Sequence, residues 1–259
     1  MKMKITTVYG PVSSWRLGRS LGIDPICAER KICTFDCMYC SLGRTARKTV
    51  DRRIFVPARV VERALKEALK KVEADVVTFS GTGEPTLAEN LGELIETARD
   101  VSGLPIAVLT NSSLLFRKDV RRELARADVV KGKLDASNDE LFKRINCPHE
   151  KISLSKVIKG LENFRKEFAG SFALEIMFVP ENKQFSEEIA KIVRTIKPDE
   201  IQINTPLRPS PVRPLTPAEL RDVQKSFKGM NFRTVYKAGK PRVGKVIGKK
   251  KIKKLKRVD

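Results

Sequence analysis

The chain has 259 residues, of which 41% are hydrophobic and 32% are charged, and its formal net charge is +21. This composition supplies enough apolar side chains for a folded core and excludes a disordered chain. No run approaches the roughly 18 apolar residues of a membrane helix. The first residues, MKMKITTVYGP, lack the apolar segment of a secretory signal. We therefore expect a cytoplasmic protein with no membrane partner.

Strand and helix patterns alternate along the chain. In chain order the predicted elements are a strand at 5–10, a helix at 57–73, a strand at 74–81, a helix at 87–103, a strand at 104–113, a helix at 117–127, a strand at 128–137, a helix at 153–168, a strand at 171–180, a helix at 186–197 and a strand at 199–207. Apolar strands separated by single helices are typical of parallel βαβ units.

The length favours an open barrel. A complete eight-stranded barrel usually needs about 250 residues, and roughly 200 remain here after the first loop and the tail. We predict an α/β fold, a partial (βα)6 barrel over residues 1–236 with a basic C-terminal extension over 237–259. A doubly wound sheet is the alternative, because periodicity alone does not distinguish the two.

The extension holds eleven Lys or Arg and one Asp, a net charge of +10, and the rest of the chain carries +11. A block of like charge is typical of an arm that contacts an anionic partner. The body of the chain, residues 1–236, is basic as well, so nucleic acid is a candidate partner of the whole protein. A lysine-rich surface is also typical of proteins from hot environments, which is the alternative for the body.

Three of the five cysteines, Cys33, Cys37 and Cys40, lie within the stretch CTFDCMYC. Disulfides are the weaker interpretation, because cytoplasmic thiols stay reduced and five is an odd number. Three thiolates can hold three irons of a cubic [4Fe–4S] cluster, which normally has four cysteine ligands. The fourth iron would then be open to another ligand. Cys27 could supply a fourth sulfur, so a structural zinc site is the alternative.

The spacing C-x3-C-x2-C, with an aromatic residue before the last cysteine, resembles the radical S-adenosylmethionine (radical SAM) superfamily. The stretch FSGTGEPTL, residues 79–87, resembles the glycine–glutamate–proline motif that follows the second strand in that superfamily. The stretches YGPVSSWRLGRSLGIDP, LTNSSLL, KLDAS, RINCPH and NTPLRP resemble a narrower group of archaeal and bacterial radical SAM proteins classed with wyosine tRNA synthases. The superfamily's usual core is a partial (βα)6 barrel.

The resemblance implies that Cys33, Cys37 and Cys40 hold a [4Fe–4S] cluster and that S-adenosylmethionine binds the fourth iron through its amino and carboxylate groups. One electron, from a donor such as ferredoxin or flavodoxin, would cleave the sulfonium to methionine and a 5′-deoxyadenosyl radical. That radical would take a hydrogen atom from the substrate, while the protein positions and shields the cofactor.

Further residues are candidates for binding S-adenosylmethionine. The candidates are Tyr39, Gly81, Gly83, Glu84, Thr110, Asn111, Ser112, Glu175 and Asn204. The two glycines allow close approach of backbone to a ligand, and Glu84 could accept from the methionine amino group. By resemblance, Tyr39 would face the adenine. The alternatives are a tight turn for the glycines, simple packing for the tyrosine, and a helix cap for the polar residues at 110–112.

Lys133 and Asp135 are the candidate catalytic residues. They are two positions apart, so they face the same side of a predicted strand, and a charged pair there suggests a barrel interior that faces a ligand. A buried structural salt bridge is the alternative, and Lys133 could instead form a Schiff base with a carbonyl substrate. Glu175 and Asn204 could point inward in the same way. Cys147 and His149, which lie together in RINCPHE, receive no role.

Taken together, these patterns predict a radical SAM enzyme that modifies a nucleoside in tRNA. Wyosine synthases carry a second cluster on additional cysteines, and Cys27 and Cys147 are too few for one, so the exact wyosine reaction is not expected. One alternative is a radical SAM enzyme acting on a small metabolite or a protein side chain. Another is a zinc-stabilised, non-enzymatic RNA-binding protein.

Overall fold

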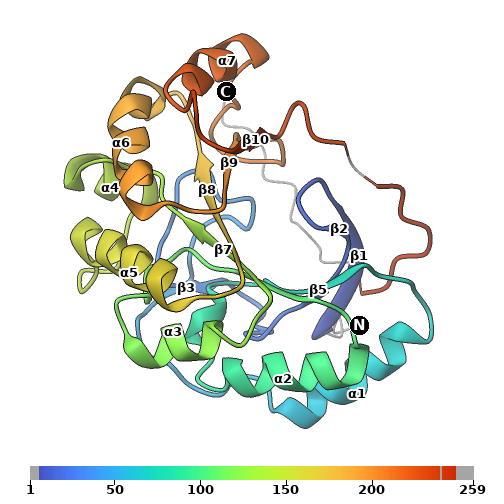
Figure 1. Cartoon of the computed structure of the whole chain (residues 1–259). Coiled ribbons are helices and arrows are strands. Elements are labelled where there is room, and N and C mark those ends of the chain that lie inside the picture. The colour runs from blue at the N-terminus through green and yellow to red at the C-terminus, as the bar shows by residue number, and fades with distance from the viewer. Residues whose placement is uncertain (1–5, 240, 249–259) are drawn as a thin grey trace.

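The computed structural model describes residues 6–239 and 241–248. Within them, one eight-stranded sheet has the order β1-β2-β5-β6-β7-β8-β9-β10. Its strands are β1 (Val8–Ser14), β2 (Gly18–Ile23), β5 (Val76–Phe79), β6 (Ile106–Leu109), β7 (Val129–Lys133), β8 (Ser171–Met177), β9 (Glu200–Asn204) and β10 (Phe232–Thr234). All neighbours from β2 to β10 are parallel, and β1 alone is antiparallel to its neighbour. Figure 1 shows the sheet curling into a partial barrel.

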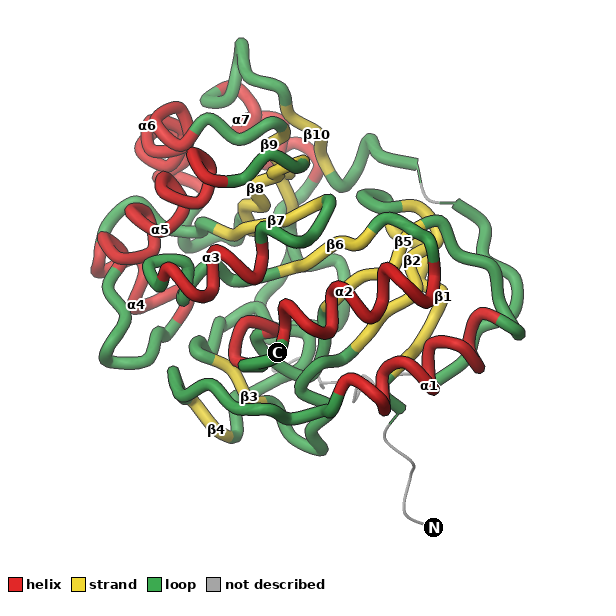
Figure 2. The backbone as a smooth tube through the Cα atoms, turned by 60° about the horizontal axis from the view of Figure 1, so that its bottom comes forward, coloured by secondary structure: helices red, strands yellow, loops and turns green. Residues whose placement is uncertain are grey.

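Helices cover the outer side of this sheet (Figure 2). They are α1 (Ala58–Leu69), α2 (Leu91–Ser102), α3 (Lys118–Leu124), α4 (Asp139–Asn146), α5 (Leu154–Glu167), α6 (Ser186–Ile196) and α7 (Pro217–Lys225). Each βα unit begins at one of the strands β2, β5, β6, β7, β8 and β9, so the predicted (βα)6 partial barrel is confirmed. The doubly wound alternative is wrong, because such a sheet would carry helices on both faces.

The two faces of the barrel strands differ in chemistry. Val77 and Phe79, with Val108 and Val130 on the next strands, are fully buried in the apolar core between sheet and helices. Every second residue faces the inside of the barrel instead, and many of these inner residues are polar: Ser20, Thr78, Lys131, Lys133, Glu175, Gln202 and Asn204. The interior of a closed barrel is normally filled with branched apolar side chains, so the polar interior marks a candidate site.

The first strand differs from the sequence-based prediction. Residues 5–10 predicted an opening barrel strand, but β1 is an antiparallel edge strand, and β2 is the first parallel strand of the barrel. The β2 stretch contains glycine, arginine and serine, so it lacks an apolar strand pattern. Its inward side is small and polar, with Ser20 Oγ 2.6 Å from Thr78 Oγ1. The sequence patterns also gave no indication of the short elements α4, α7 and β10.

Residues 241–248 run beside β1 in the described structure. Gly10 N donates to Ile247 O at 2.9 Å, Ile247 N donates to Gly10 O at 2.6 Å, and Ser13 Oγ donates to Pro241 O at 2.5 Å. Residues 240 and 249–259 lie outside the described residues, so the RNA-binding role predicted for the basic extension stays a prediction. No helix in the described ranges has both the length and the apolar character needed to cross a membrane.

Candidate active site

The three clustered cysteines lie on a loop at the carboxyl end of the barrel strands. Two short strands, β3 (Ile32–Cys33) and β4 (Arg47–Lys48), pair in parallel and fix the base of this loop. Ile32 N donates to Thr82 O at 3.0 Å, which ties the loop to the turn after β5. Met38 N donates to Ile145 O at 3.0 Å, which ties it to the end of α4. We call residues 31–48 the cysteine loop.

Amide donors point at two of the cysteine sulfurs. Asn111 Nδ2 lies 3.5 Å from Cys33 Sγ, and Asn146 Nδ2 lies 3.5 Å from Cys37 Sγ. Burial raises the pKa of the Cys33 thiol to about 11 and that of Cys37 to about 12. No disulfide links the described cysteines. Sulfurs that are buried and receive N–H donors are suited to become thiolates when a cationic metal centre compensates their charge.

The donor set fits an iron–sulfur cluster better than a single ion. In the described part of the chain, no three His, Cys, Asp or Glu side chains gather in a way that could hold one metal ion. A tetrahedral zinc site needs four ligands around one point. A cubic cluster spreads its ligands over separate irons, so its cysteines do not converge. Cys27, the fourth sulfur of the zinc alternative, lies 3.6 Å from Thr7 Oγ1.

The glycines of the GTGEP turn allow close approach between segments of the protein itself. A Cβ on Gly83 would lie 1.5 Å from Ile32 O, and a Cβ on Gly81 would lie 1.9 Å from Asp24 Oδ1. Asp24 in turn accepts from Thr82 N at 3.0 Å. The close approach that these glycines allow in this structure is therefore made to the cysteine loop and to the end of β2. Contact of these glycines with S-adenosylmethionine stays a prediction.

Glu84 connects the GTGEP turn to the end of β6. Its side chain is buried, and Oε1 accepts from Thr86 Oγ1 at 2.7 Å and from Thr110 Oγ1 at 2.6 Å. Oε2 accepts from Asn111 N at 2.7 Å. Burial raises the pKa of Glu84, and these donors oppose that shift. The carboxylate thus holds two predicted site segments together, and its predicted contact with the methionine amino group would use the remaining capacity of Oε2.

The polar residues after β6 bind the cysteine loop and β7. Asn111 Nδ2 donates to Thr34 Oγ1 at 2.7 Å, and Ser112 Oγ accepts from Lys133 N at 2.7 Å. Helix α3 begins at Lys118, so the helix-cap alternative for these residues does not apply. Their predicted contact with S-adenosylmethionine stays a prediction. Of the three, Asn111 lies beside Cys33, at the predicted cofactor site.

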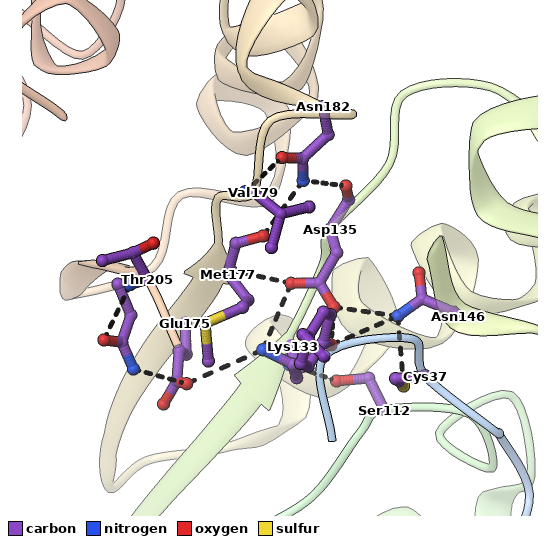
Figure 3. A network of polar contacts seen from close by, with 12 residues as sticks. Cys37, Ser112, Lys133, Asp135, Asn146, Glu175, Met177, Val179, Asn182 and Thr205 are labelled. Atoms are coloured by element: carbon purple, nitrogen blue, oxygen red, sulfur yellow. Dashed lines mark hydrogen bonds and ion pairs between the residues drawn. The ribbon is translucent and has the colours of Figure 1, made fainter. Parts of the chain in front are cut away.

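Lys133 and Asp135 meet inside the barrel, as expected from their spacing (Figure 3). Lys133 Nζ lies 3.2 Å from Asp135 Oδ1 and 5.0 Å from the Tyr39 ring centroid. Asp135 also accepts from Met177 N at 2.8 Å, from Asn146 Nδ2 at 2.8 Å and from the Tyr39 hydroxyl. The buried salt bridge is thus present, and Asp135 joins the cysteine loop to β7 and β8. A catalytic role for the pair stays a prediction.

Glu175 and Asn204 also point inward. Asn204 Nδ2 donates to Glu175 Oε1 at 3.2 Å, and Lys133 Nζ lies 3.6 Å from the same oxygen. The other oxygen of Glu175 pairs with Arg16, which comes from the turn between β1 and β2. Sequence patterns did not single out Arg16, because its partner is distant in the chain and nothing local marks the turn as part of the interior.

Comparison with known proteins identifies the family. The family model for the radical SAM superfamily matches residues 31–199. This chain belongs to the radical SAM superfamily. A UPF0026 protein of Synechocystis sp. is 42% identical over 214 residues, covering 82% of this chain and 80% of that protein. The radical SAM assignment makes the protein an enzyme of that class, so the non-enzymatic alternative is wrong.

Solved structures of other proteins share the fold at low sequence identity. SuiB of Streptococcus suis, in a crystal structure bound to S-adenosylmethionine, is 18% identical with a TM-score of 0.63, covering 84% of this chain and 50% of that one. A structure of TYW1 with a lysine-pyruvate adduct bound is 18% identical with a TM-score of 0.62, covering 82% of this chain and 74% of that one. The family implies that this radical SAM enzyme uses S-adenosylmethionine and an iron–sulfur cluster, and Cys33, Cys37 and Cys40 are the residues that would hold the cluster.

Lys131 is a second lysine in the interior of this radical SAM barrel, and the sequence patterns did not select it. Its side chain is buried on the same side of β7 as Lys133. Burial lowers the pKa of Lys131 to about 7; Arg16 adds to this shift and Glu200 opposes it. At neutral pH the amine therefore has a substantial neutral fraction. The signal that could have identified Lys131 is the presence of charged residues at every second position of β7. The strand is short, however, and the valines around Lys131 gave the stretch an apolar pattern.

We expect Lys131→Met to raise the melting temperature at about pH 7.5 by a few degrees, since each kcal/mol corresponds to roughly 2–4 °C in a protein of this size. The pKa of Lys131 in the folded state lies below its value in the unfolded state. The loss in free energy of unfolding that Lys131 causes therefore grows as pH falls from about 10 toward 7. The gain from the substitution should therefore shrink toward about pH 9.5. Thermal melts followed by circular dichroism check this. Lys66→Met, on the exposed face of α1, is the control. An equal gain in melting temperature from Lys131→Met at both pH values would contradict the charge argument.

Proposed function

We propose that this radical SAM enzyme modifies a nucleoside in tRNA, in a reaction related to wyosine synthesis but not identical to it. The observation that carries the proposal is a group of exposed cationic side chains around the cysteine loop. This group and the formal net charge of +21 both favour binding of a polyanion near the candidate site.

The basic rim consists of exposed residues on the cysteine loop, just before it, and at the end of α4. Its members are Arg30, Arg44, Arg47, Lys48, Lys143 and Arg144. Lys48 Nζ donates to Cys147 O at 3.3 Å and to Pro148 O at 3.2 Å, which joins the two segments. Side chains of this kind bind phosphates of the nucleic acid backbone and orient it without reading its sequence. The rim would therefore hold tRNA while a single nucleoside enters the barrel.

The residues inside the barrel would position that nucleoside. When bound, the cluster and S-adenosylmethionine supply a radical that removes a hydrogen atom. Cys33, Cys37 and Cys40 would hold the cluster. Lys133 and Asp135 would contact the substrate, and their burial would exclude water from it. An electron donor such as ferredoxin or flavodoxin completes the proposed system.

Two further observations support a reaction close to that of wyosine synthases. TYW1 shares the fold, and its structure has a lysine-pyruvate adduct bound. The interior of this barrel also holds lysines, Lys131 and Lys133. Against an identical reaction, Cys27 and Cys147 are the only cysteines outside the cysteine loop, and they lie on separate segments of the described fold.

The deciding experiment compares the modified nucleosides of total tRNA, by mass spectrometry, from cells with and without the gene. One nucleoside should be lost without the gene and restored by a plasmid copy of the wild type. A Cys37→Ala copy should fail to restore it. If no tRNA nucleoside changes, tRNA is not the substrate, and a small metabolite or a protein side chain takes its place.

Binding of tRNA should depend on the basic rim. We expect the triple change Arg44→Gln, Arg47→Gln and Lys48→Gln to weaken tRNA binding by about tenfold or more at low salt and to reduce the slope of log affinity against log salt by roughly two to three. Filter binding or fluorescence anisotropy at several salt concentrations measures both quantities.

The matched control is Arg59→Gln, Arg63→Gln and Lys66→Gln on the exposed face of α1, which removes the same charge from a different surface. The control should keep most of the affinity. If the two triple variants lose affinity equally, the net charge rather than the rim governs binding, and docking at the cysteine loop is contradicted.

A further inference from the structure

Asn146 is the last residue of α4, and its amide lies between the cysteine loop and the charged residues of the barrel interior (Figure 3). The residue is only 2% exposed. Its Nδ2 lies 2.8 Å from Asp135 Oδ2, 3.4 Å from the Tyr39 hydroxyl and 3.5 Å from Cys37 Sγ. The proposed binding of tRNA and the predicted ligation of the cluster do not use this amide.

Backbone hydrogen bonds fix the end of α4 against the segment around Cys37. Asp36 N donates to Asn146 O at 3.0 Å, and Met38 N donates to Ile145 O at 3.0 Å. These two N–H groups lie on either side of Cys37 in the chain. The last carbonyls of a helix have no partner within the helix, so the cysteine loop satisfies carbonyls that α4 leaves free. The docking of the helix on the loop therefore sets the distance between the Asn146 amide and the Cys37 sulfur.

Asp135 determines which end of the Asn146 amide faces the sulfur. Asp135 is paired with Lys133, and an ionised carboxylate only accepts hydrogen bonds. The NH₂ group of Asn146, and not its carbonyl oxygen, must therefore lie beside Asp135 Oδ2. The amide oxygen, Oδ1, is buried and has no hydrogen-bond partner in the described structure, so the contacts of Nδ2 alone orient the amide.

The second hydrogen of Nδ2 has two possible acceptors, the sulfur of Cys37 and the oxygen of Tyr39. The 3.4 Å between Nδ2 and the Tyr39 oxygen is long for an N–H···O hydrogen bond. The 3.5 Å between Nδ2 and Cys37 Sγ suits sulfur, because sulfur is a larger atom than oxygen. The geometry therefore favours an N–H···S hydrogen bond to Cys37.

A donor to a ligating sulfur affects the redox chemistry of a bound cluster. Cluster potentials depend on net charge, on hydrogen bonds to the sulfurs and on solvent exposure. Reduction adds one negative charge, and hydrogen bonds to charged acceptors are stronger than hydrogen bonds to neutral ones. The N–H group of Asn146 would therefore stabilise the reduced cluster more than the oxidised cluster. Since the amide is buried, the low local dielectric strengthens this effect.

We propose that Asn146 is a positioning residue that raises the reduction potential of the cluster through an N–H···S hydrogen bond to Cys37. The inference rests on the cluster that the radical SAM assignment implies, and it is independent of the proposed tRNA substrate. It also connects Asp135 to electron uptake by the cluster, because Asp135 holds the amide in the orientation that directs an N–H group to the sulfur.

The test is a redox titration of the reconstituted cluster, followed by electron paramagnetic resonance, without S-adenosylmethionine or tRNA. Asn146→Leu removes both N–H groups at a similar side-chain size. Iron and sulfide contents are measured first, so that only proteins with a full cluster are compared. At the potential where half of the wild-type cluster is reduced, the Asn146→Leu protein should show about a tenfold lower ratio of reduced to oxidised cluster, which is a shift of about 59 mV for one electron.

Asn138→Ala is the matched control, because it removes the cap at the other end of α4 and leaves the donor to Cys37 in place. Asn138 is exposed, and its Oδ1 accepts from Leu141 N at 2.9 Å. This variant should titrate like the wild type. If it shifts the potential as much as Asn146→Leu does, the packing of α4 governs the potential, and the proposal is overturned.

Asn146→Ala is titrated instead if Asn146→Leu does not take up a full cluster. A variant that lacks the donor but has a full cluster and an unchanged titration would overturn the proposal. If neither variant takes up a full cluster, Asn146 is needed for cluster assembly rather than for the potential, and the proposal is overturned as well. None of these results affects the tRNA proposal, since no tRNA is used.

Discussion

Changing any one of Cys33, Cys37 and Cys40 to alanine is expected to abolish reductive cleavage of S-adenosylmethionine. Each removes the only sulfur that would hold one iron, so the cluster loses a corner and no neighbouring side chain replaces it. Activity should fall by at least about a thousandfold, because the cofactor supplies the difficult step and the protein alone does not. Iron analysis after anaerobic reconstitution, with chromatography of 5′-deoxyadenosine, measures both losses.

Cys27→Ser and Cys147→Ser are the matched controls. Cys27 lies beside Thr7, and Cys147 ends α4 in a left-handed conformation with φ of 42°. Neither belongs to the cysteine loop, so both variants should keep the full iron content and cleave S-adenosylmethionine at close to the wild-type rate. Loss of iron in Cys27→Ser would instead show that a fourth protein sulfur closes the metal site, and the open iron on which the radical SAM chemistry depends would be refuted.

The sequence was enough to predict those features of this protein whose residues lie close together in the chain. The three cysteines are within eight positions of one another, and the GTGEP turn follows directly after an apolar strand. The alternation of apolar strands with amphipathic helices was enough to predict the partial barrel. Each of these patterns lies within one short segment of the chain, so residue spacing and periodicity were enough to predict the feature correctly.

The parts that the sequence did not show depend on contacts between distant segments. Arg16 reaches Glu175 from a hairpin turn, and Asp24 organises the GTGEP turn through Thr82 N. Strand β2 has small and polar residues because its inner face lies against Thr78 and the ring of Tyr9. A polar residue whose partner is more than fifty positions away has no local signature. Tertiary contacts therefore decided these roles.

The same reasoning explains why the interior network was predicted only in part. Lys133 and Asp135 stood out because they are charged residues two positions apart on one strand. Their meeting with Tyr39 and Asn146 was not predictable, since these side chains come from the cysteine loop and from α4. The short helix α4 gave no long periodic pattern, although Asn138 caps its first turn through Leu141 N. One missed helix thus concealed a donor to the sulfur of Cys37.

Gly83→Ala is expected to be the most damaging single substitution outside the cysteines. Its Cβ would lie 1.5 Å from Ile32 O, a backbone atom that cannot rotate away. The same carbonyl accepts from Glu84 N at 3.2 Å, so relieving the clash would separate the GTGEP turn from the base of the cysteine loop. We expect the free energy of unfolding to fall by about 3 kcal/mol or more, with loss of cluster uptake. Chemical denaturation and iron analysis measure the two effects.

Gly81→Ala tests whether backbone contact is the cause. Its Cβ would meet Asp24 Oδ1, a side-chain atom rather than a backbone atom, so the loss should be smaller than for Gly83→Ala. Gly239→Ala, at a position with no atom within 4 Å of the added Cβ, should leave stability and iron content unchanged. Equal losses in the two turn variants would show that the turn responds to any added Cβ rather than to Ile32. A stable Gly83→Ala protein with a full cluster would mean that the close contact between turn and cysteine loop does not position the cysteines.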